Sequence, residues 1–180
     1  MIEGKGLTMR FGNNTALDGV DVCFGDNKIY GLLGRNGAGK STLLSVVTNR
    51  LLPTAGEVFI DGEPARENDR VLGRVYYMGE KTLLPDTATV AQLFRWTGDF
   101  YPGFDGEYAG QLADTFGLPE KKKLKNLSTG YLTIAKLITA LASNAPYTLF
   151  DEPVLGLDAN HRDMFYKILL ESYAARPRTI

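Results

Sequence analysis

The chain has 180 residues, of which 44% are hydrophobic, 23% charged and 11% aromatic, a composition typical of one folded, soluble domain and unlike disordered, collagen-like or coiled-coil proteins. Twenty Lys and Arg nearly balance twenty-one Asp and Glu, so no global field favours nucleic acid or an anionic membrane. A single cysteine, Cys23, excludes an internal disulfide, and no apolar run approaches the roughly 20 residues of a transmembrane helix.

The first sixty residues alternate strand-like runs with turn residues, which predicts antiparallel strands over residues 6–11 and 16–24. Residues 28–33 are nearly continuously apolar, as expected of a parallel strand that is buried on both faces. A glycine-rich loop follows, then a predicted helix over residues 41–51 and a short strand over residues 57–60.

The rest of the chain is mostly helical in its pattern. Apolar positions recur at helical spacing over residues 89–116, with an interruption at Tyr101-Pro102-Gly103. This predicts a helical insert, followed by further α/β structure. The remaining expected elements are a strand over residues 74–78, a helix over 128–142, a strand over 147–150 and a helix over 159–175.

The glycine loop G-R-N-G-A-G-K-S, residues 34–41, fits the pattern G-x-x-x-x-G-K-[ST] and lies after a predicted buried strand and before a helix. Glycines let backbone N–H groups point inward, and the helix start adds positive potential, so a triphosphate finds donors there. Lys40 can bridge the β- and γ-phosphates, and the Ser41 hydroxyl is a suitable Mg²⁺ ligand. The alternative is a glycine turn with a solvated lysine. The nucleotide-binding candidates in this region are Gly34, Asn36, Gly37, Ala38, Gly39, Lys40, Ser41 and Thr42.

Two adjacent carboxylates, Asp151 and Glu152, end the predicted strand over residues 147–150. Asp151 can reach the shell of a Mg²⁺ ion, and Glu152 can orient and deprotonate an attacking water; acids at this position also occur as helix caps. Ser128 and Gly130 open another helix, where Ser128 suits an N-cap and Gly130 permits close backbone approach. That segment suits a phosphate, although a Ser-x-Gly before a helix is usually just a cap.

These motifs, in this order, resemble the nucleotide-binding subunit of ABC transporters. Residues 126–131, N-L-S-T-G-Y, resemble the L-S-G-G-Q signature with Thr129 and Tyr131 departing from it; residues 147–153 resemble a Walker B strand with the catalytic glutamate, and residues 155–158 a D-loop. The resemblance implies an α/β P-loop NTPase fold with a RecA-like parallel sheet core, an N-terminal antiparallel β subdomain and a helical insert. It also implies that the chain is one ABC ATPase domain, with the core over residues 1–82 and 127–180 and the helical subdomain over 83–126, and that the chain lacks the C-terminal strand with the switch histidine.

The resemblance also implies roles for further residues. Phe11 matches the aromatic residue that stacks on adenine, the alternative being a core aromatic at a strand end. Glu80 takes the place of the Q-loop glutamine and could approach Mg²⁺ or its water; a solvated loop glutamate is an equal alternative. Ser128 and Gly130 would close over ATP bound to a second, identical or different ATPase subunit in a head-to-tail dimer.

The implied function is ATP hydrolysis that powers transport through a separate transmembrane permease subunit, at the cytoplasmic face of the cell membrane and without nucleic acid. The Glu80 and L-S-T-G variants resemble bacterial ABC-2-type exporters of drugs or peptides. Two alternatives stay open: a soluble ABC-type ATPase that acts on ribosomes or DNA, and a nucleotide-binding regulatory fragment without turnover.

The family's switch histidine is expected at the end of a strand beyond Ile180, whereas His161, the one histidine, lies on a predicted helix after the D-loop. The sequence is therefore expected to be cut before a strand that would lie beside the strand over residues 28–33. Loss of that strand would leave unpaired backbone groups. We expect the 180-residue chain to be unstable alone and to hydrolyse ATP poorly.

Overall fold

The computed structural model describes residues 1–79, 85 and 87–180. Its contacts divide the chain into two compact units, Met1–Val75 with Arg178–Ile180, and Tyr76–Pro177. Each unit is described by itself. The expected division into a core over residues 1–82 and 127–180 and a helical subdomain over 83–126 stays a prediction.

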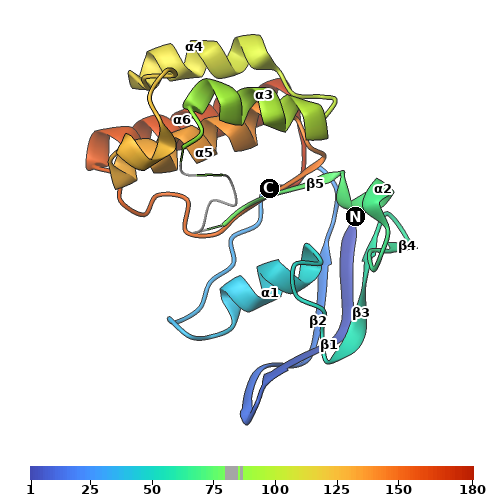
Figure 1. Ribbon diagram of the computed structural model, residues 1–180. Coiled ribbons are helices and arrows are strands. Elements are labelled where there is room, and N and C mark those ends of the chain that lie inside the picture. Colours follow the sequence, from blue (N-terminus) through green and yellow to red (C-terminus); the bar gives the residue numbers. More distant parts are fainter. Residues whose placement is uncertain (80–84, 86) are drawn as a thin grey trace. The chain divides into compact units, whose positions relative to one another are not determined.

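The first unit is built on a four-stranded sheet with the order β2-β1-β3-β4 (Figure 1). The expected antiparallel pairing at the start of the chain is confirmed, because Ile2 lies opposite Phe24 at one end of the β1–β2 hairpin and Phe11 opposite Asn14 at the other. Helix α1 packs against β1 and β2. The elements of this unit are β1 (Ile2–Phe11), β2 (Asn14–Phe24), α1 (Lys40–Val47), β3 (Ala55–Ile60), β4 (Glu63–Pro64) and α2 (Asp69–Leu72).

Alternation of side chains, shifted by an irregularity of β1 between Gly4 and Leu7, explains the core of this unit. Ile2 and Leu7 of β1 and Ile60 of β3 are fully buried, as are Val46 and Val47 at the end of α1. Burying branched apolar side chains is the main favourable term that holds a helix on a sheet. Helix α1 is shorter than the predicted 41–51, because its backbone leaves the helical path just after Thr48, at Asn49, which has a φ of 55°.

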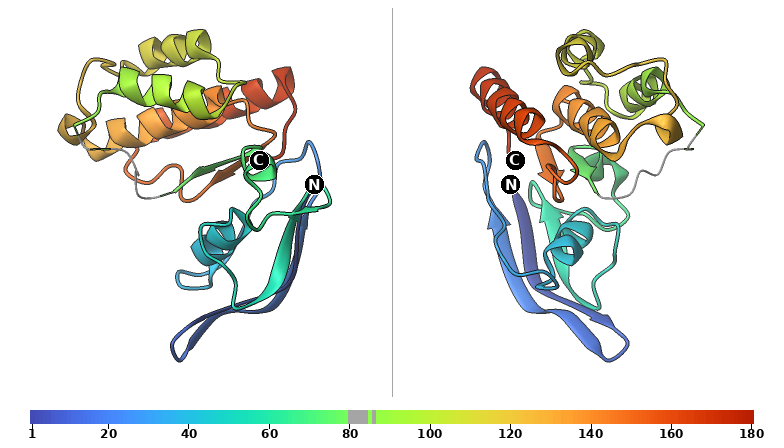
Figure 2. Two further views of the ribbon diagram at one scale, coloured as in Figure 1. Left: turned by 45° about the vertical axis from the view of Figure 1, so that its right-hand side comes forward. Right: turned by 90° about the vertical axis from the view of Figure 1, so that its left-hand side faces the viewer.

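The second unit is a group of helices beside a two-stranded sheet (Figure 2). Helix α5 is its centre: it contacts α3, α4 and α6, and its Ile134, Leu137, Ile138 and Leu141 are buried. The elements are β5 (Val75–Met78, whose first residue belongs to the first unit), α3 (Val90–Phe100), α4 (Gly106–Phe116), the 3₁₀ turn η1 (Leu124–Asn126), α5 (Thr129–Ala142), β6 (Tyr147–Phe150) and α6 (Ala159–Ala175). All except η1, which was not predicted, lie close to their predicted bounds.

The prediction for residues 28–33 is wrong. These residues are exposed, with Leu33 93% exposed and Ile29 43% exposed, and they form no regular strand. A strand buried on both faces requires hydrogen-bonded neighbours and packing layers on each side. The backbone bonds described for this segment instead run to the last residue of the sequence: Tyr30 N–H donates to Ile180 O (2.7 Å), and Ile180 N–H donates to Lys28 O (2.9 Å).

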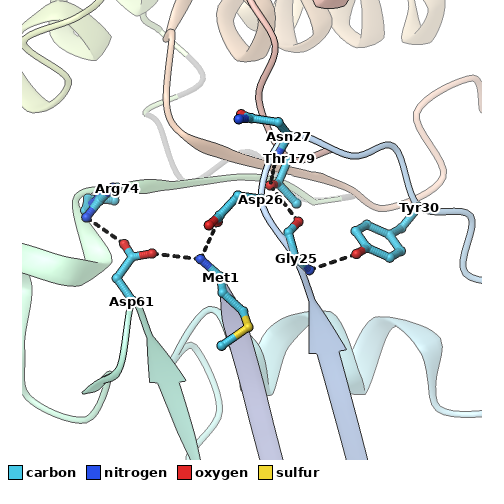
Figure 3. A network of polar contacts seen from close by, with 8 residues as sticks. All are labelled: Met1, Gly25, Asp26, Asn27, Tyr30, Asp61, Arg74 and Thr179. Atoms are coloured by element: carbon cyan, nitrogen blue, oxygen red, sulfur yellow. Dashed lines mark hydrogen bonds and ion pairs between the residues drawn. The ribbon is translucent and has the colours of Figure 1, made fainter.

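A polar network holds the residues that lead into this segment (Figure 3). The Thr179 hydroxyl donates to Gly25 O (3.1 Å) and accepts from Asn27 N–H (3.0 Å), while Gly25 N–H donates to the Tyr30 hydroxyl (2.8 Å). Asp26, the residue after Gly25, contacts the Met1 ammonium. The path from β2 towards the glycine loop is therefore fixed by contacts with residues far away in the sequence.

Asp61 extends the same network on the other side of the Met1 ammonium. Its carboxylate accepts from that ammonium (2.7 Å) and forms an ion pair with Arg74 (2.6 Å). Partial burial lowers the pKa of the amine, but the hydrogen bonds and charges of Asp26 and Asp61 outweigh it, so the pKa is raised. The amine is therefore held in its charged form.

Candidate nucleotide-binding site

The glycine loop ends where α1 begins, and that helix start has an unusual feature. Its N-cap residue, Gly39, supplies no side-chain hydrogen bond. By contrast, α3, α4, α5 and α6 each begin after a residue whose side chain accepts from a first-turn N–H; these residues are Thr89, Asp105, Ser128 and Asp158. A helix start that no side chain caps keeps N–H donors and positive potential for an anion.

Two glycines shape the loop in different ways. Gly37 and Gly39 both have left-handed backbones, with φ of 82° and 85°, which L side chains adopt with strain. A Cβ atom at Gly37 would meet nothing within 4 Å, whereas one at Gly39 would lie 2.5 Å from the backbone oxygen of Ala16. Gly39 is therefore required both for its φ and for close approach to β2.

The Lys40 side chain folds back over the loop. Its ammonium donates to Gly34 O (2.8 Å) and to Arg35 O (3.0 Å), which places a positive charge inside the turn of the loop. The other loop candidates, Asn36 and Ala38, are exposed, as is Ser41, and Thr42 is half-buried. The loop residues named from the sequence thus lie together around one ammonium and one helix start.

Asp151 lies directly after β6 in the second unit. Its N–H donates to Met78 O of β5 (2.9 Å), and its Oδ2 accepts from the Tyr77 hydroxyl (3.1 Å). Sequence reasoning did not identify Tyr77, because its distance of 74 positions from Asp151 carries no local signal. Glu152 follows with an exposed side chain and a φ of 49°, a conformation that is uncommon for residues other than glycine and is found at strained functional positions.

The start of α5 lies against the loop that precedes α6. Ser128 Oγ accepts from Tyr131 N–H (3.2 Å), and the Thr133 hydroxyl donates to Leu155 O (3.1 Å). A Cβ at Gly130 would lie 3.0 Å from Gly156 O. The signature-like and D-loop-like segments, which the sequence separates, thus form one packed corner.

Asp158 is the last residue of the D-loop-like segment and the N-cap of α6. Its Oδ1 accepts from His161 N–H (2.9 Å), and its Oδ2 lies 2.6 Å from His161 Nδ1. The backbone hydrogen bond from His161, followed by the side-chain bond, lowers the pKa of Asp158. The His161 ring also stacks on Phe116, with 6.2 Å between ring centroids, and meets the edge of Tyr131 at 6.5 Å.

Two further candidates from the sequence are Phe11 and Glu80. Phe11 ends β1 and is 47% exposed, so the alternative of a core aromatic is wrong. Glu80 lies outside the described residues. The glycine loop belongs to the first unit, whereas Asp151, Glu152, Ser128 and Gly130 belong to the second.

Each unit, taken by itself, has residues whose chemistry suits a magnesium–nucleotide complex. A helix start without a side-chain cap and an adjacent ammonium suit phosphates, and the hydroxyl of Ser41 and the carboxylate of Asp151 are the hard oxygen ligands that Mg²⁺ prefers. In the part of the chain that the structure describes, no helix is long and apolar enough to cross a membrane.

Comparison with known proteins identifies the family. The model of the family described as ABC transporter matches residues 17–155. The "ABC transporter ATP-binding protein YtrB" of Bacillus subtilis (strain 168) is 32% identical over 180 residues, all of this chain and 62% of that protein. The "probable multidrug ABC transporter ATP-binding protein YbhF" of Escherichia coli (strain K12) is 31% identical over 92% of this chain and 30% of its own length. The chain thus spans less than two thirds of either relative.

The fold agrees with that of solved cassettes. The structure described as a dimeric post-hydrolysis state of the ATP-binding cassette MJ0796, bound to ADP and Pi, superposes with a TM-score of 0.82 over 99% of this chain and 85% of that one, at 24% identity. This likeness shows the expected α/β cassette fold, with an antiparallel β subdomain and a parallel sheet. The chain therefore belongs to the ABC transporter family, of which it is an ATP-binding cassette.

Proposed function

We propose that this cassette binds Mg²⁺–ATP and hydrolyses it as part of a head-to-tail pair of ATPase subunits, and so powers a separate transmembrane permease from the cytoplasmic face of the membrane. One observation carries the proposal: α1 begins on Gly39 without a side-chain cap, directly beside the Lys40 ammonium. Donors and charge at one helix start are what a triphosphate requires.

Binding begins with an exchange of hydrogen bonds. Lys40 leaves the carbonyls of Gly34 and Arg35, which it contacts in this structure, and turns to the β- and γ-phosphates. The loop residues Asn36, Gly37, Ala38 and Thr42 line the phosphates together with the helix start. Phe11, which is 47% exposed, offers an aromatic ring on which adenine can stack.

Hydrolysis relies on the acidic pair after β6. Ser41 and Asp151 would hold Mg²⁺, with Glu80 as a further candidate, and the ion neutralises charge on the phosphates. Glu152 accepts a proton from the attacking water and orients it towards the γ-phosphate. The exposed carboxylate of Glu152 suits that role, because it can meet a water at the surface of its own unit.

A second copy completes the site. Ser128 Oγ accepts from Tyr131 N–H, and because a hydroxyl both accepts and donates, its O–H stays able to donate to the γ-phosphate of a partner. Gly130, without a side chain, lets the backbone approach. The dimer described for the relative with ADP and Pi supports this arrangement, and the multidrug description of YbhF supports an exporter.

The test measures binding and association in the full-length protein. Lys40→Ala should abolish binding of a fluorescent ATP analogue, whereas Lys167→Ala, which removes an exposed charge on α6, should not. Glu152→Gln should trap a dimer with Mg²⁺ and ATP, measured by light scattering. Unchanged binding in Lys40→Ala would refute the phosphate site, and a Glu152→Gln protein that binds ATP yet stays monomeric would refute the pair.

A further inference from the structure

Tyr77 makes a contact that the function above does not use. Its hydroxyl donates to Asp151 Oδ2 at 3.1 Å. The two residues come from the neighbouring strands β5 and β6, and the N–H of Asp151 also donates to the carbonyl of Met78 (2.9 Å). Both the backbone and the carboxylate of Asp151 are thus held by consecutive residues of β5.

Gly79 leaves room for the Tyr77 ring in this position. Residues two apart on an extended chain point to the same side, so a side chain at position 79 would be directed at the Tyr77 ring. A Cβ at Gly79 would lie 2.8 Å from Tyr77 Cε1 and 3.2 Å from its hydroxyl oxygen. The pattern Tyr-x-Gly therefore lets the phenol lie over the backbone with its hydroxyl at Asp151.

We propose that Tyr77 is a positioning residue that aims the Asp151 carboxylate at the metal, an inference that rests on the proposed role of Asp151 as a magnesium ligand. Rotation of an aspartate carboxylate about its last bond is broad. A hydrogen bond from the phenol to Oδ2 restricts that rotation and so fixes the direction in which Oδ1 points. Hydrogen bonds to ligating carboxylates orient them, and their loss commonly reduces metal affinity about 10- to 100-fold.

The test separates metal affinity from nucleotide affinity in the full-length protein. Tyr77→Phe keeps the ring and removes the hydroxyl. We expect it to raise about tenfold the Mn²⁺ concentration that half-saturates the ATP-bound protein, measured by electron paramagnetic resonance. Binding of a fluorescent ATP analogue in EDTA should stay unchanged, because Tyr77→Phe removes only a hydroxyl that donates to a metal-ligand candidate and leaves every residue of the glycine loop as it is. Tyr166→Phe, which removes an exposed hydroxyl on α6, should change neither quantity.

A second variant acts on the same hydroxyl without altering Tyr77. Gly79→Ala should push the phenol away from Asp151 and weaken Mn²⁺ binding, and the double variant with Tyr77→Phe should bind no more weakly than Tyr77→Phe alone. Losses of Mn²⁺ affinity that add up in the double variant would overturn the proposal. So would a loss of ATP-analogue binding that is equally large with metal and in EDTA.

Asp151→Asn distinguishes this inference from the proposed function on which it rests. If Asp151→Asn weakens Mn²⁺ binding while Tyr77→Phe does not, the role of Tyr77 is wrong and that of Asp151 stands. If Asp151→Asn leaves Mn²⁺ binding unchanged, the magnesium assignment is wrong, and the role of Tyr77 falls with it.

Discussion

Replacing each of two loop glycines by alanine separates backbone strain from steric contact in the glycine loop. Gly37 and Gly39 have nearly the same φ, 82° and 85°, so an alanine at either position bears the cost of a left-handed backbone, about 1–2 kcal/mol. The unfolded chain loses freedom with alanine, which offsets about 0.4–1 kcal/mol of that cost. Gly37→Ala should therefore lower the free energy of unfolding by about 1 kcal/mol.

Gly39→Ala should cost more, because its Cβ would lie 2.5 Å from Ala16 O, where real contacts essentially never fall below 3.0 Å. The oxygen belongs to the backbone of β2, so relief requires the sheet edge or the start of α1 to shift. Overpacking of this kind costs about 1–3 kcal/mol. The free energy of unfolding should thus fall by about 2–4 kcal/mol in total.

Urea denaturation followed by circular dichroism gives both free energies of unfolding, and amide hydrogen exchange over residues 40–47 localises the change. We expect Gly39→Ala to accelerate exchange in α1 and to weaken binding of a fluorescent ATP analogue more than Gly37→Ala does. Equal losses of stability in the two variants would refute the argument that the Ala16 carbonyl constrains the loop.

Two further predictions concern the acidic residues after β6. Glu152→Gly should be more stable to urea than Glu152→Ala by about 1 kcal/mol, because both lack the carboxylate but only alanine is strained at a φ of 49°; equal stabilities would contradict the strain. The pKa of Asp158 is lowered in the folded state, so its carboxylate stabilises the fold at pH values above its ordinary pKa of 3.8. This contribution should be lost as the pH falls through the lower pKa of the folded state. When the free energy of unfolding is measured against pH, Asp158→Asn should abolish this acid-induced decrease in stability. His161→Ala should retain most of the decrease, since the backbone N–H of residue 161 is the larger cause of the lowered pKa. If the decrease disappears in His161→Ala, the ring and not the backbone N–H dominates.

Local sequence patterns predicted most elements and named the candidate residues of the site. Strand-like runs between turn residues predicted β1 and β2, helical periodicity and capping residues predicted α3 to α6, and Ser128 is the N-cap that its residue type indicated. The glycine loop before α1 and the acidic pair after β6 lie where the sequence placed them. These features depend on neighbouring residues, and steric and capping preferences act over a few positions.

Tertiary structure decided the contacts between distant residues. The Tyr77 hydroxyl at Asp151, the close approach of Gly130 to Gly156 and the bonds of Thr179 to Gly25 and Asn27 join residues 26 to 154 positions apart. Tertiary structure also decided the burial of residues 28–33. Their apolar pattern predicted a buried strand, yet Leu33 is 93% exposed. The pattern of apolar residues predicts which side chains gain stability from burial. Burial itself requires a neighbouring layer of helices or strands, which other parts of the fold must supply.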